Sequence, residues 1–184
     1  MIYERSKITP DLVIIYPDVF EDSRGLFTET YQSDKYKEII GEQEFLQDNL
    51  SYSKKNVIRG LHYQLNNPQG KLVRCVKGVV YDVAVDIRPD SSTFGKWDGV
   101  LLTSDTHTQF WIPPGFAHGF SVISDEAYFE YKCTTLRDAK SEGALSYDDR
   151  DLSIDWKVKN GIISDKDKSG ISFEELKCQL LKHH

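Results

Sequence analysis

The chain has 184 residues, a length typical of one domain with its own hydrophobic core. Hydrophobic residues make up 39% and charged residues 28%, which indicates a soluble globular protein. The formal net charge is -6 and no long basic run occurs, so the composition argues against general binding to nucleic acid or to an anionic membrane. An anionic ligand would need a local cluster of cations.

The cysteines and the N-terminal segment point to a reducing compartment. Cys75, Cys133 and Cys178 are widely spaced and form no CxxC motif, as is typical of free thiols rather than of a disulfide framework or a zinc site. The opening MIYERSKITPDL lacks the apolar segment of a signal peptide, and no run approaches the ~18 apolar residues of a membrane span. We therefore expect a cytoplasmic protein. The final KHH is natural or a trace of a tag, and we assign it no function.

Strands dominate the predicted elements. They are short, and turn signals such as EDSRG, NNPQG, RPDSSTFG, TSDT and IPPG separate them. Within 71–88, Gly78 divides two runs, and the second run alternates as a half-buried strand would, with Asp82 and Asp86 on its polar face. The predicted strands are 12–16, 26–31, 45–53, 56–64, the two runs of 71–88, 98–103, 108–112, 119–124 and 126–135.

Two short helices are predicted at the periphery. SDKYKEIIG should begin with Ser33 as N-cap and end at Gly41, and SFEELKCQLLKHH, about 172–182, has Ser172 and Glu175 at capping-box spacing. Many short strands with Gly/Pro turns predict an all-β jelly roll, sandwich or barrel. We expect a single domain over 1–184, with its core over about 10–170.

The stretch NVIRGLHYQ, residues 56–64, carries polar side chains in an otherwise apolar strand. His62 and Gln64 share a face, and Arg59 lies close by. For any one such residue, the solvent-exposed face of a sheet is the commoner environment. Together they favour a barrel whose interior is a polar pocket. The other polar residues on predicted strands are Gln47, Asp48, Asn49, Lys71, Arg74, Asp82, Asp86, His118, Tyr131 and Lys132.

These residue types suit proton transfer at carbon next to a carbonyl. A neutral imidazole is a base near pH 7, a Lys ammonium stabilises an enolate oxygen, and a Tyr hydroxyl can return a proton from the other side. Arginines would hold a phosphate or diphosphate. No HxH pair occurs outside the terminal KHH, so a catalytic metal is the less favoured interpretation, and no cofactor is expected.

Several motifs together resemble the dTDP-4-dehydrorhamnose 3,5-epimerase family. They are DVFEDSRGLFTET, FLQDNLSYSKKNVIRGLHYQ, PQGKLVRCVKGVVYDVAVDIRPDS, IPPGFAHGF and the SDKD of ISDKDKSG, in the family's order over roughly residues 10 to 170. The resemblance implies a cupin-type β jelly roll, a homodimer and a metal-independent enzyme. Such enzymes invert C3 and then C5 of dTDP-4-dehydro-6-deoxy-D-glucose to give dTDP-4-dehydro-L-rhamnose.

The resemblance also implies roles for individual residues. His62 would be the base and Asp167 the carboxylate that orients it, with Asp82 as the fallback partner. Lys71 would stabilise the enolate, and Tyr131 would donate a proton from the opposite face. The RGxFxE element, with Arg24, Phe27 and Glu29, would cross to the partner's site. Contacts to the nucleotide sugar would come from Arg24, Phe27, Glu29, Gln47, Asp48, Asn49, Arg59, His118, Glu142 and Lys166.

Geometry sets one condition on this assignment. Arg59 and His62 are three residues apart and would face opposite ways in a regular strand, so both reach one ligand only if Gly60 makes a bulge. Two departures from the family pattern occur, SYDDRD in place of a tryptophan–asparagine–aspartate–proline stretch and a charged Glu130 before Tyr131.

Other functions stay open at this point. The same residues could serve a C3-only or C5-only epimerase, or one that takes a GDP- or UDP-linked 4-keto sugar. More distant alternatives are a metal-dependent cupin enzyme and a non-catalytic sugar-binding module. The nucleotide base, the exact sugar and the downstream pathway are not fixed by the sequence.

Overall fold

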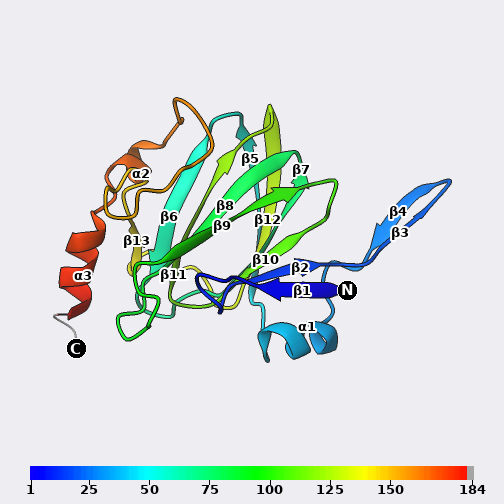
Figure 1. Ribbon diagram of the computed structural model, residues 1–184, viewed down its shortest axis with the longest axis horizontal. Helices are drawn as coiled ribbons and strands as arrows, with labels where there is room; N and C mark the ends of the chain where they lie inside the picture. Colours follow the sequence, from blue (N-terminus) through cyan, green and yellow to red (C-terminus); the bar gives the residue numbers. More distant parts are fainter. Residues whose placement is uncertain (182–184) are drawn as a thin grey trace.

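A computed structural model describes residues 1–181 (Figure 1). Strands dominate it, which confirms the all-β prediction. The helices are α1 (Ser33–Ile40), α2 (Asp165–Lys168) and α3 (Phe173–Leu181). The strands are β1 (Ile2–Arg5), β2 (Val13–Tyr16), β3 (Val19–Asp22), β4 (Gly25–Thr28), β5 (Gln47–Lys54), β6 (Ile58–Gln64), β7 (Lys71–Lys77), β8 (Val79–Asp86), β9 (Trp97–Thr103), β10 (Gln109–Ile112), β11 (Phe116–Val122), β12 (Glu126–Cys133) and β13 (Glu142–Ala144).

Two antiparallel sheets pack face to face as a jelly roll. One has the order β1-β2-β10-β7-β12-β5 and the other β13-β6-β11-β8-β9. Their inner faces share a core that includes Phe110, Phe120 and Phe129, and the Phe120 and Phe129 rings stack 4.3 Å apart. The β3–β4 hairpin forms a separate two-stranded sheet that projects away from the barrel (Figure 1).

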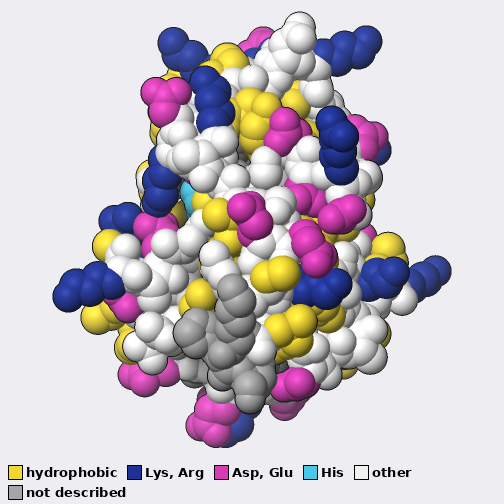
Figure 2. Space-filling model, turned by 90° about the vertical axis from the view of Figure 1, so that its left-hand side faces the viewer, with side chains coloured by type: hydrophobic (Ala, Val, Ile, Leu, Met, Phe, Trp, Pro, Cys, Tyr) yellow, Lys and Arg dark blue, Asp and Glu magenta, His cyan; other side chains and the backbone are white. Residues whose placement is uncertain are grey.

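Each outer face has its own cover. Helix α1 packs Tyr36 and Ile39 against the six-stranded sheet. On the five-stranded sheet, the C-terminal segment places Trp156 and Leu176 over Val85 and its neighbours. Figure 2 shows the side of the molecule that carries this layer, where acidic, basic and apolar side chains are interspersed without a continuous basic patch. We call this covering segment the C-terminal layer; it excludes water from the apolar outer face of the five-stranded sheet.

The C-terminal layer corrects the prediction for β8. This strand is buried on both faces rather than half-buried. Val83 and Val85 pack outward against the C-terminal layer, whereas Asp82 and Asp86 point into the barrel and are 0% exposed. The predicted alternation of polar and apolar residues along β8 is confirmed, but its polar face points into the barrel.

Some boundaries differ from those predicted. Gln32, not Ser33, caps α1, because its side chain accepts a hydrogen bond from the Lys35 amide at 2.7 Å. The Ser172–Glu175 capping box of α3 is confirmed. The strands β1, β3 and β13 and the short helix α2 were not predicted, and β4 ends before residue 31. Residue 182, the predicted helix end, and the terminal KHH lie outside the described residues.

The predicted bulge lies at Gly60 in β6. His62 pairs with His118 of β11, and Arg59 pairs with Phe120. Three residues along β6 therefore lie opposite two along β11, which is the one extra residue of a β-bulge. Gly60 has φ +111°, and the Gly60–Leu61 peptide is cis. The bulge turns Ile58 and Leu61 outward into the C-terminal layer, and His62 then lies on the same inner side as Arg59.

Gly60→Ala should destabilise the protein by about 2 kcal/mol or more, because a Cβ at this position would lie 2.5 Å from the His118 carbonyl oxygen, at an unfavourable φ. Gly25→Ala is the matched control, since Gly25 has φ +132° but no atom within 4 Å of its Cβ position. Urea unfolding of both variants measures the difference. Equal losses would mean that φ alone, and not the close approach to β11, requires Gly60.

Candidate functional site

Two adjoining cavities open beside β6, and His62 lines both. The first cavity has a volume of about 210 Å³. Its lining residues include members of β5, β7 and β12 in one sheet and of β6 in the other, so both sheets build it. Its lining residues are Gln47, Asn49, His62, Tyr63, Gln64, Gln69, Lys71, Tyr131, Arg137 and Glu142. The second cavity, about 410 Å³, is lined by Arg59, Lys166 and Asp167 among others. The structure thus brings together nine of the predicted site residues around one imidazole: Gln47, Asn49, Arg59, Lys71, Tyr131, Glu142, Lys166, Asp167 and His62 itself.

Asp167 holds the His62 imidazole. The carboxylate lies 2.7 Å from Nε2 of His62, and it also accepts a hydrogen bond from the Gly60 amide at 3.2 Å. Ser164 caps α2 by accepting from the Asp167 amide, which fixes the residue that carries the carboxylate. With Nε2 directed at Asp167, Nδ1 is the nitrogen left to take a proton. The imidazole is 32% exposed, so a ligand can reach it.

The environment of Asp167 keeps it ionised. Burial by itself raises the pKa of this carboxyl group, but the hydrogen bonds from His62 and Gly60 and the charge of His62 outweigh burial, and the pKa lies below its usual value. An ionised Asp167 stabilises the imidazolium that forms when His62 takes a proton.

Lys71 is a buried ammonium without a hydrogen-bond partner among residues 1–181. It is 8% exposed at the start of β7, beside Cys133 of β12. Burial lowers its pKa, while the nearby negative groups Asp82 and Glu142 partly oppose this effect. A buried cation with unused donors suits an oxyanion that develops during a reaction.

Tyr131 lies on β12 and lines the same cavity as His62 and Lys71. Burial raises the pKa of its hydroxyl group, with Arg59 as an opposing influence. The phenol therefore stays protonated over the neutral pH range and can act as an acid.

His118 and Asp82 form a second pair deeper in the barrel. Nε2 of His118 lies 2.9 and 3.0 Å from the two Asp82 oxygens, and both residues are buried. Burial lowers the pKa of His118 and raises that of Asp82. Asp82, the fallback partner for His62, is therefore engaged by His118. His118 itself lies behind the two cavities and does not line them.

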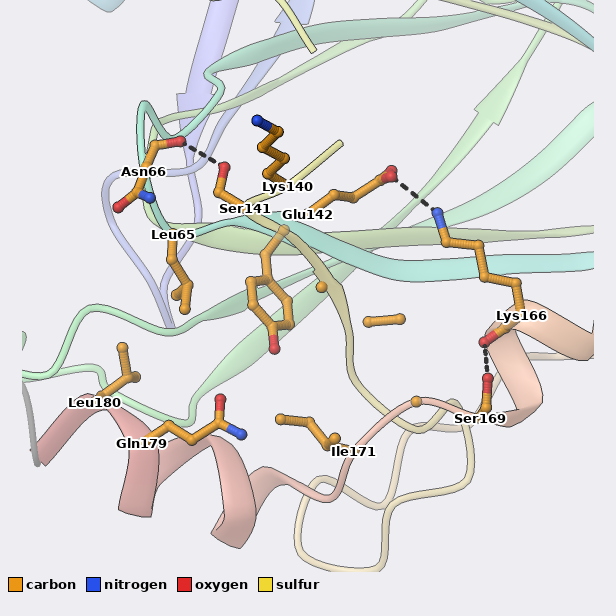
Figure 3. A pocket seen from close by; sticks show the side chains of 14 residues that line it. Leu65, Asn66, Lys140, Ser141, Glu142, Lys166, Ser169, Ile171, Gln179 and Leu180 are labelled. Carbon is orange, nitrogen blue, oxygen red and sulfur yellow. Dashed lines mark hydrogen bonds and ion pairs between the residues drawn. The ribbon is translucent and has the colours of Figure 1, made fainter. Parts of the chain in front are cut away.

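Glu142 joins the edge strand β13 to α2. Its carboxylate accepts from Lys166 at 2.9 Å and from Arg137 at 2.7 Å, and Figure 3 shows the contact to Lys166. Burial raises the pKa of Glu142, but these two cations outweigh it and hold the pKa below its usual value. The same ion pair borders an outer cavity of about 770 Å³ between β13 and α3 (Figure 3).

The QDN segment of β5 splits between two faces. Gln47 and Asn49 line the cavity, whereas Asp48 points outward and pairs with Lys132 at 3.0 Å. Asp48 therefore does not line the cavity of its own chain, because successive residues of a strand face opposite ways. Its predicted contact with the nucleotide sugar stays a prediction. Arg59 is oriented by Ser53 Oγ and by the Tyr52 carbonyl oxygen.

Arg24, Phe27 and Glu29 do not reach the pocket of their own chain. Arg24 lies in the projecting β3–β4 hairpin, and its side chain is 88% exposed and paired only with Asp22 among the described residues. Phe27 is 68% exposed in the same hairpin, and Glu29 pairs with Lys35 of α1.

The two departures from the family pattern have local explanations. Glu130 lies on the outer face of β12, where its carboxylate accepts from Arg74 Nε at 2.7 Å. In the SYDDRD segment, Asp149 accepts hydrogen bonds from the Leu152 and Phe173 amides and so ties this loop to the start of α3. Neither residue lines the two cavities beside His62.

Four residues of the 210 Å³ cavity were missed by the sequence reasoning: Tyr63, Gln64, Gln69 and Arg137. Tyr63 follows His62 in β6 and was not singled out, and Gln64 was noted as polar but given no role. Gln69 and Arg137 lie in loops, where no periodicity indicates a direction. Within residues 1–181, no three His, Cys, Asp or Glu side chains cluster as a metal site would require. No helix of this part is long and apolar enough to cross a membrane.

Comparisons with known proteins show which sequences and folds this chain is similar to. A family model described as dTDP-4-dehydrorhamnose 3,5-epimerase matches residues 6–175. A protein of that name from Shigella flexneri is 51% identical over 166 residues, covering 89% of this chain and 92% of the relative.

Two solved structures share the fold. An epimerase from Legionella pneumophila in complex with dTDP-4-keto-L-rhamnose has 44% identity and a TM-score of 0.93, covering 97% of this chain and 95% of its own. NovW of Streptomyces spheroides, a 4-keto-6-deoxy sugar epimerase, has 33% identity and a TM-score of 0.93, with 98% and 92% covered. The cupin-type jelly roll is confirmed by these structures.

The Asp167 carboxylate should make stability depend on pH. Because its folded-state pKa is lowered, it stabilises the fold above its unfolded pKa of about 3.9, and this contribution is lost as the pH falls through the folded pKa. The difference in unfolding free energy between wild type and Asp167→Asn should be largest near pH 6 and shrink below about pH 4. Urea unfolding across that range measures it, and a difference that grows on acidification would contradict the ionised state.

Proposed function

The chain belongs to the dTDP-4-dehydrorhamnose 3,5-epimerase family, and on that premise we propose that its pocket inverts C3 and then C5 of dTDP-4-dehydro-6-deoxy-D-glucose, giving dTDP-4-dehydro-L-rhamnose. The observation that carries this proposal is the Asp167-held imidazole of His62 in a cavity shared with Lys71 and Tyr131. The route uses only acids and bases of this chain and requires no metal or cofactor. The cytoplasmic location stays a prediction.

Proton removal begins at His62. Its Nδ1 takes the proton from C3, and the electrons of the broken C–H bond move to the C4 carbonyl oxygen as an enolate. Asp167 orients the ring and stabilises the imidazolium. His62 then loses its proton to solvent before the second cycle at C5.

Lys71 supports the enolate. Its ammonium lacks a hydrogen-bond partner among residues 1–181 and sits where burial strengthens its interaction with a new negative charge. Because the charge on oxygen exists only after the proton has left, this interaction lowers the barrier more than it tightens substrate binding.

Tyr131 completes the inversion by donating its hydroxyl proton to the opposite face of the carbon. The raised pKa of the buried phenol keeps this proton available, and the phenolate recovers one from solvent. Two groups on opposite faces are the minimum that inversion requires, since one base that removed and returned the proton would restore the original configuration.

Substrate binding would use a second copy of the chain. The β3–β4 hairpin exposes Phe20, Leu26 and Phe27 at 62%, 52% and 68% and makes no contact with its own pocket. Leu50 and Tyr52 are 64% and 45% exposed on the outer face of β5. Apolar side chains in such numbers are typical of a covered surface, which supports a homodimer in which Arg24, Phe27 and Glu29 enter the partner's site.

Incubation of dTDP-4-dehydro-6-deoxy-D-glucose with the enzyme in heavy water should give an L-configured product with deuterium at C3 and C5. His62→Ala should slow exchange by about 10²–10⁴-fold, since the base is absent. Tyr131→Phe should keep exchange but lose inversion. Proton NMR and mass spectrometry record both quantities.

Tyr128→Phe is the matched control for Tyr131→Phe, because Tyr128 lies on the outer face of the same strand, beside Tyr52. It should behave as wild type. Exchange at one carbon only would indicate a narrower epimerase, and full activity of His62→Ala would remove the assigned base.

A mixture of Arg24→Ala and His62→Ala chains, refolded together, tests the shared site. Each variant alone has two defective pockets, whereas a mixed dimer has one pocket with both residues intact, so activity should recover to about a quarter of wild type for random pairing. Mixing His62→Ala with Tyr131→Phe is the control, because each change disables the pocket of its own chain, so a mixed dimer has no intact pocket and no recovery is expected. Failure of the first mixture to recover would mean that Arg24 serves its own chain or no site.

A further inference from the structure

Arg137 is a cavity residue to which the proposed chemistry gives no task. It follows β12 in the loop that leads to β13, and it lines the same cavity as His62, Lys71 and Tyr131. Arg137 and Lys71 are the two cations among the residues that line this cavity. Lys71 is buried and is needed for the enolate, which leaves Arg137 without an assigned partner in the substrate.

The loop that carries Arg137 is fixed by side chains of the cavity wall. Gln47 of β5 accepts a hydrogen bond from the Arg137 amide at 3.0 Å. Gln64 of β6 accepts from the Asp138 amide at 2.9 Å and donates to the Leu136 carbonyl oxygen at 3.4 Å. Two glutamines from different sheets therefore hold three consecutive residues of one loop. Such anchoring positions Arg137 at the mouth of the cavity before any ligand binds.

The guanidinium group is oriented as well. Its Nη2 donates to Glu142 at 2.7 Å, and Glu142 also accepts from Lys166 on α2 (Figure 3). Two cations thus share one carboxylate, so one positive charge stays in excess at this rim. The neighbour Glu142 raises the pKa of Arg137, which stays charged at every working pH.

Part of the guanidinium is free to bind. The Arg137 side chain is 58% exposed, and its contact to Glu142 is its single side-chain hydrogen bond within residues 1–181. A planar fork of five N–H donors can pair with Glu142 along one edge and with a phosphate along another. The other polar residues of the cavity mouth, Gln47, Asn49 and Gln69, are neutral amides and supply no charge.

We propose that Arg137 is a substrate-binding residue that pairs with the diphosphate of the nucleotide sugar. The inference rests on the proposed function, because it takes a nucleoside diphosphate as the part of the substrate that is bound but does not react. Gln47 and Gln64 fix the loop that carries Arg137, and Glu142 orients its guanidinium group. Lys166 of α2 pairs with the same Glu142 carboxylate.

Calorimetric titration of wild type, Arg137→Ala and Arg137→Lys with thymidine, dTMP and dTDP tests the inference. Arg137→Ala should bind dTDP at least about tenfold more weakly, with thymidine affinity unchanged and dTMP in between. Arg137→Lys should lose less, since it keeps the charge without the planar fork. In turnover assays, KM should rise in Arg137→Ala while kcat is retained, as expected for a contact made equally in ground state and transition state.

Lys140→Ala is the matched control, because Lys140 is an exposed cation three residues further on that does not line the catalytic cavity. It should leave dTDP affinity unchanged. The dependence of dTDP affinity on salt should be shallower in Arg137→Ala than in wild type, which gives a readout even if thymidine binds weakly.

Three outcomes would overturn the inference. Unchanged dTDP affinity in Arg137→Ala would remove the contact, and an equal loss for thymidine would mean that Arg137 serves the base. An equal loss of dTDP affinity in Lys140→Ala would mean that the loss in Arg137→Ala comes from the general surface charge and not from a direct contact. A wild-type protein that binds no dTDP would instead remove the proposed function, so the two failures are distinguishable.

Discussion

The contact between His62 and Asp167 joins the barrel to its C-terminal layer. His62 belongs to β6, and Asp167 lies 105 residues further on, in a helix of four residues. The same carboxylate accepts from the Gly60 amide, so it holds both the imidazole and the bulge that turns the imidazole inward. The C-terminal layer therefore does more than cover apolar surface, because without it the base would have neither orientation nor its counter-charge.

The interior of this barrel combines aromatic and ionisable side chains. Phe110, Phe120 and Phe129 fill the space between the sheets. The His118–Asp82 pair lies directly beside them, since Phe120 is opposite Asp82 in the β11–β8 register and the His118 ring stacks on Phe129. Because the imidazole and the carboxylate are partners of each other, both can be buried among these rings.

Periodicity predicted most of the barrel but not its short elements. The strands 56–64 and 126–135 alternate clearly, whereas β1, β3 and β13 have only three or four residues and no apolar face to bury. The same rule misplaced the polar face of β8, since sequence alternation does not say which side will be covered by a later segment.

The site was predicted unevenly for a similar reason. Lys71 and Tyr131 stand on strands, where spacing fixes direction, whereas His62 lies on the inner side because of the bulge at Gly60. Asp48 does not line the cavity of its own chain, because its strand turns it outward. Asp167 came from the resemblance alone, because no local spacing connects it to His62. Arg137 was missed because its direction depends on hydrogen bonds to Gln47 and Gln64, which only the folded chain brings near.

Alternate residues of β12 contribute to two different environments, the interior of the barrel and its outer surface. Phe129, Tyr131 and Cys133 point into the barrel, while Glu130 and Lys132 form ion pairs outside it. Substitutions on one face can therefore accumulate without disturbing the other. A single-residue insertion or deletion is different, because it would exchange the two sets and place a carboxylate where the phenol now lies. This strand can vary in composition over time, but its length is constrained.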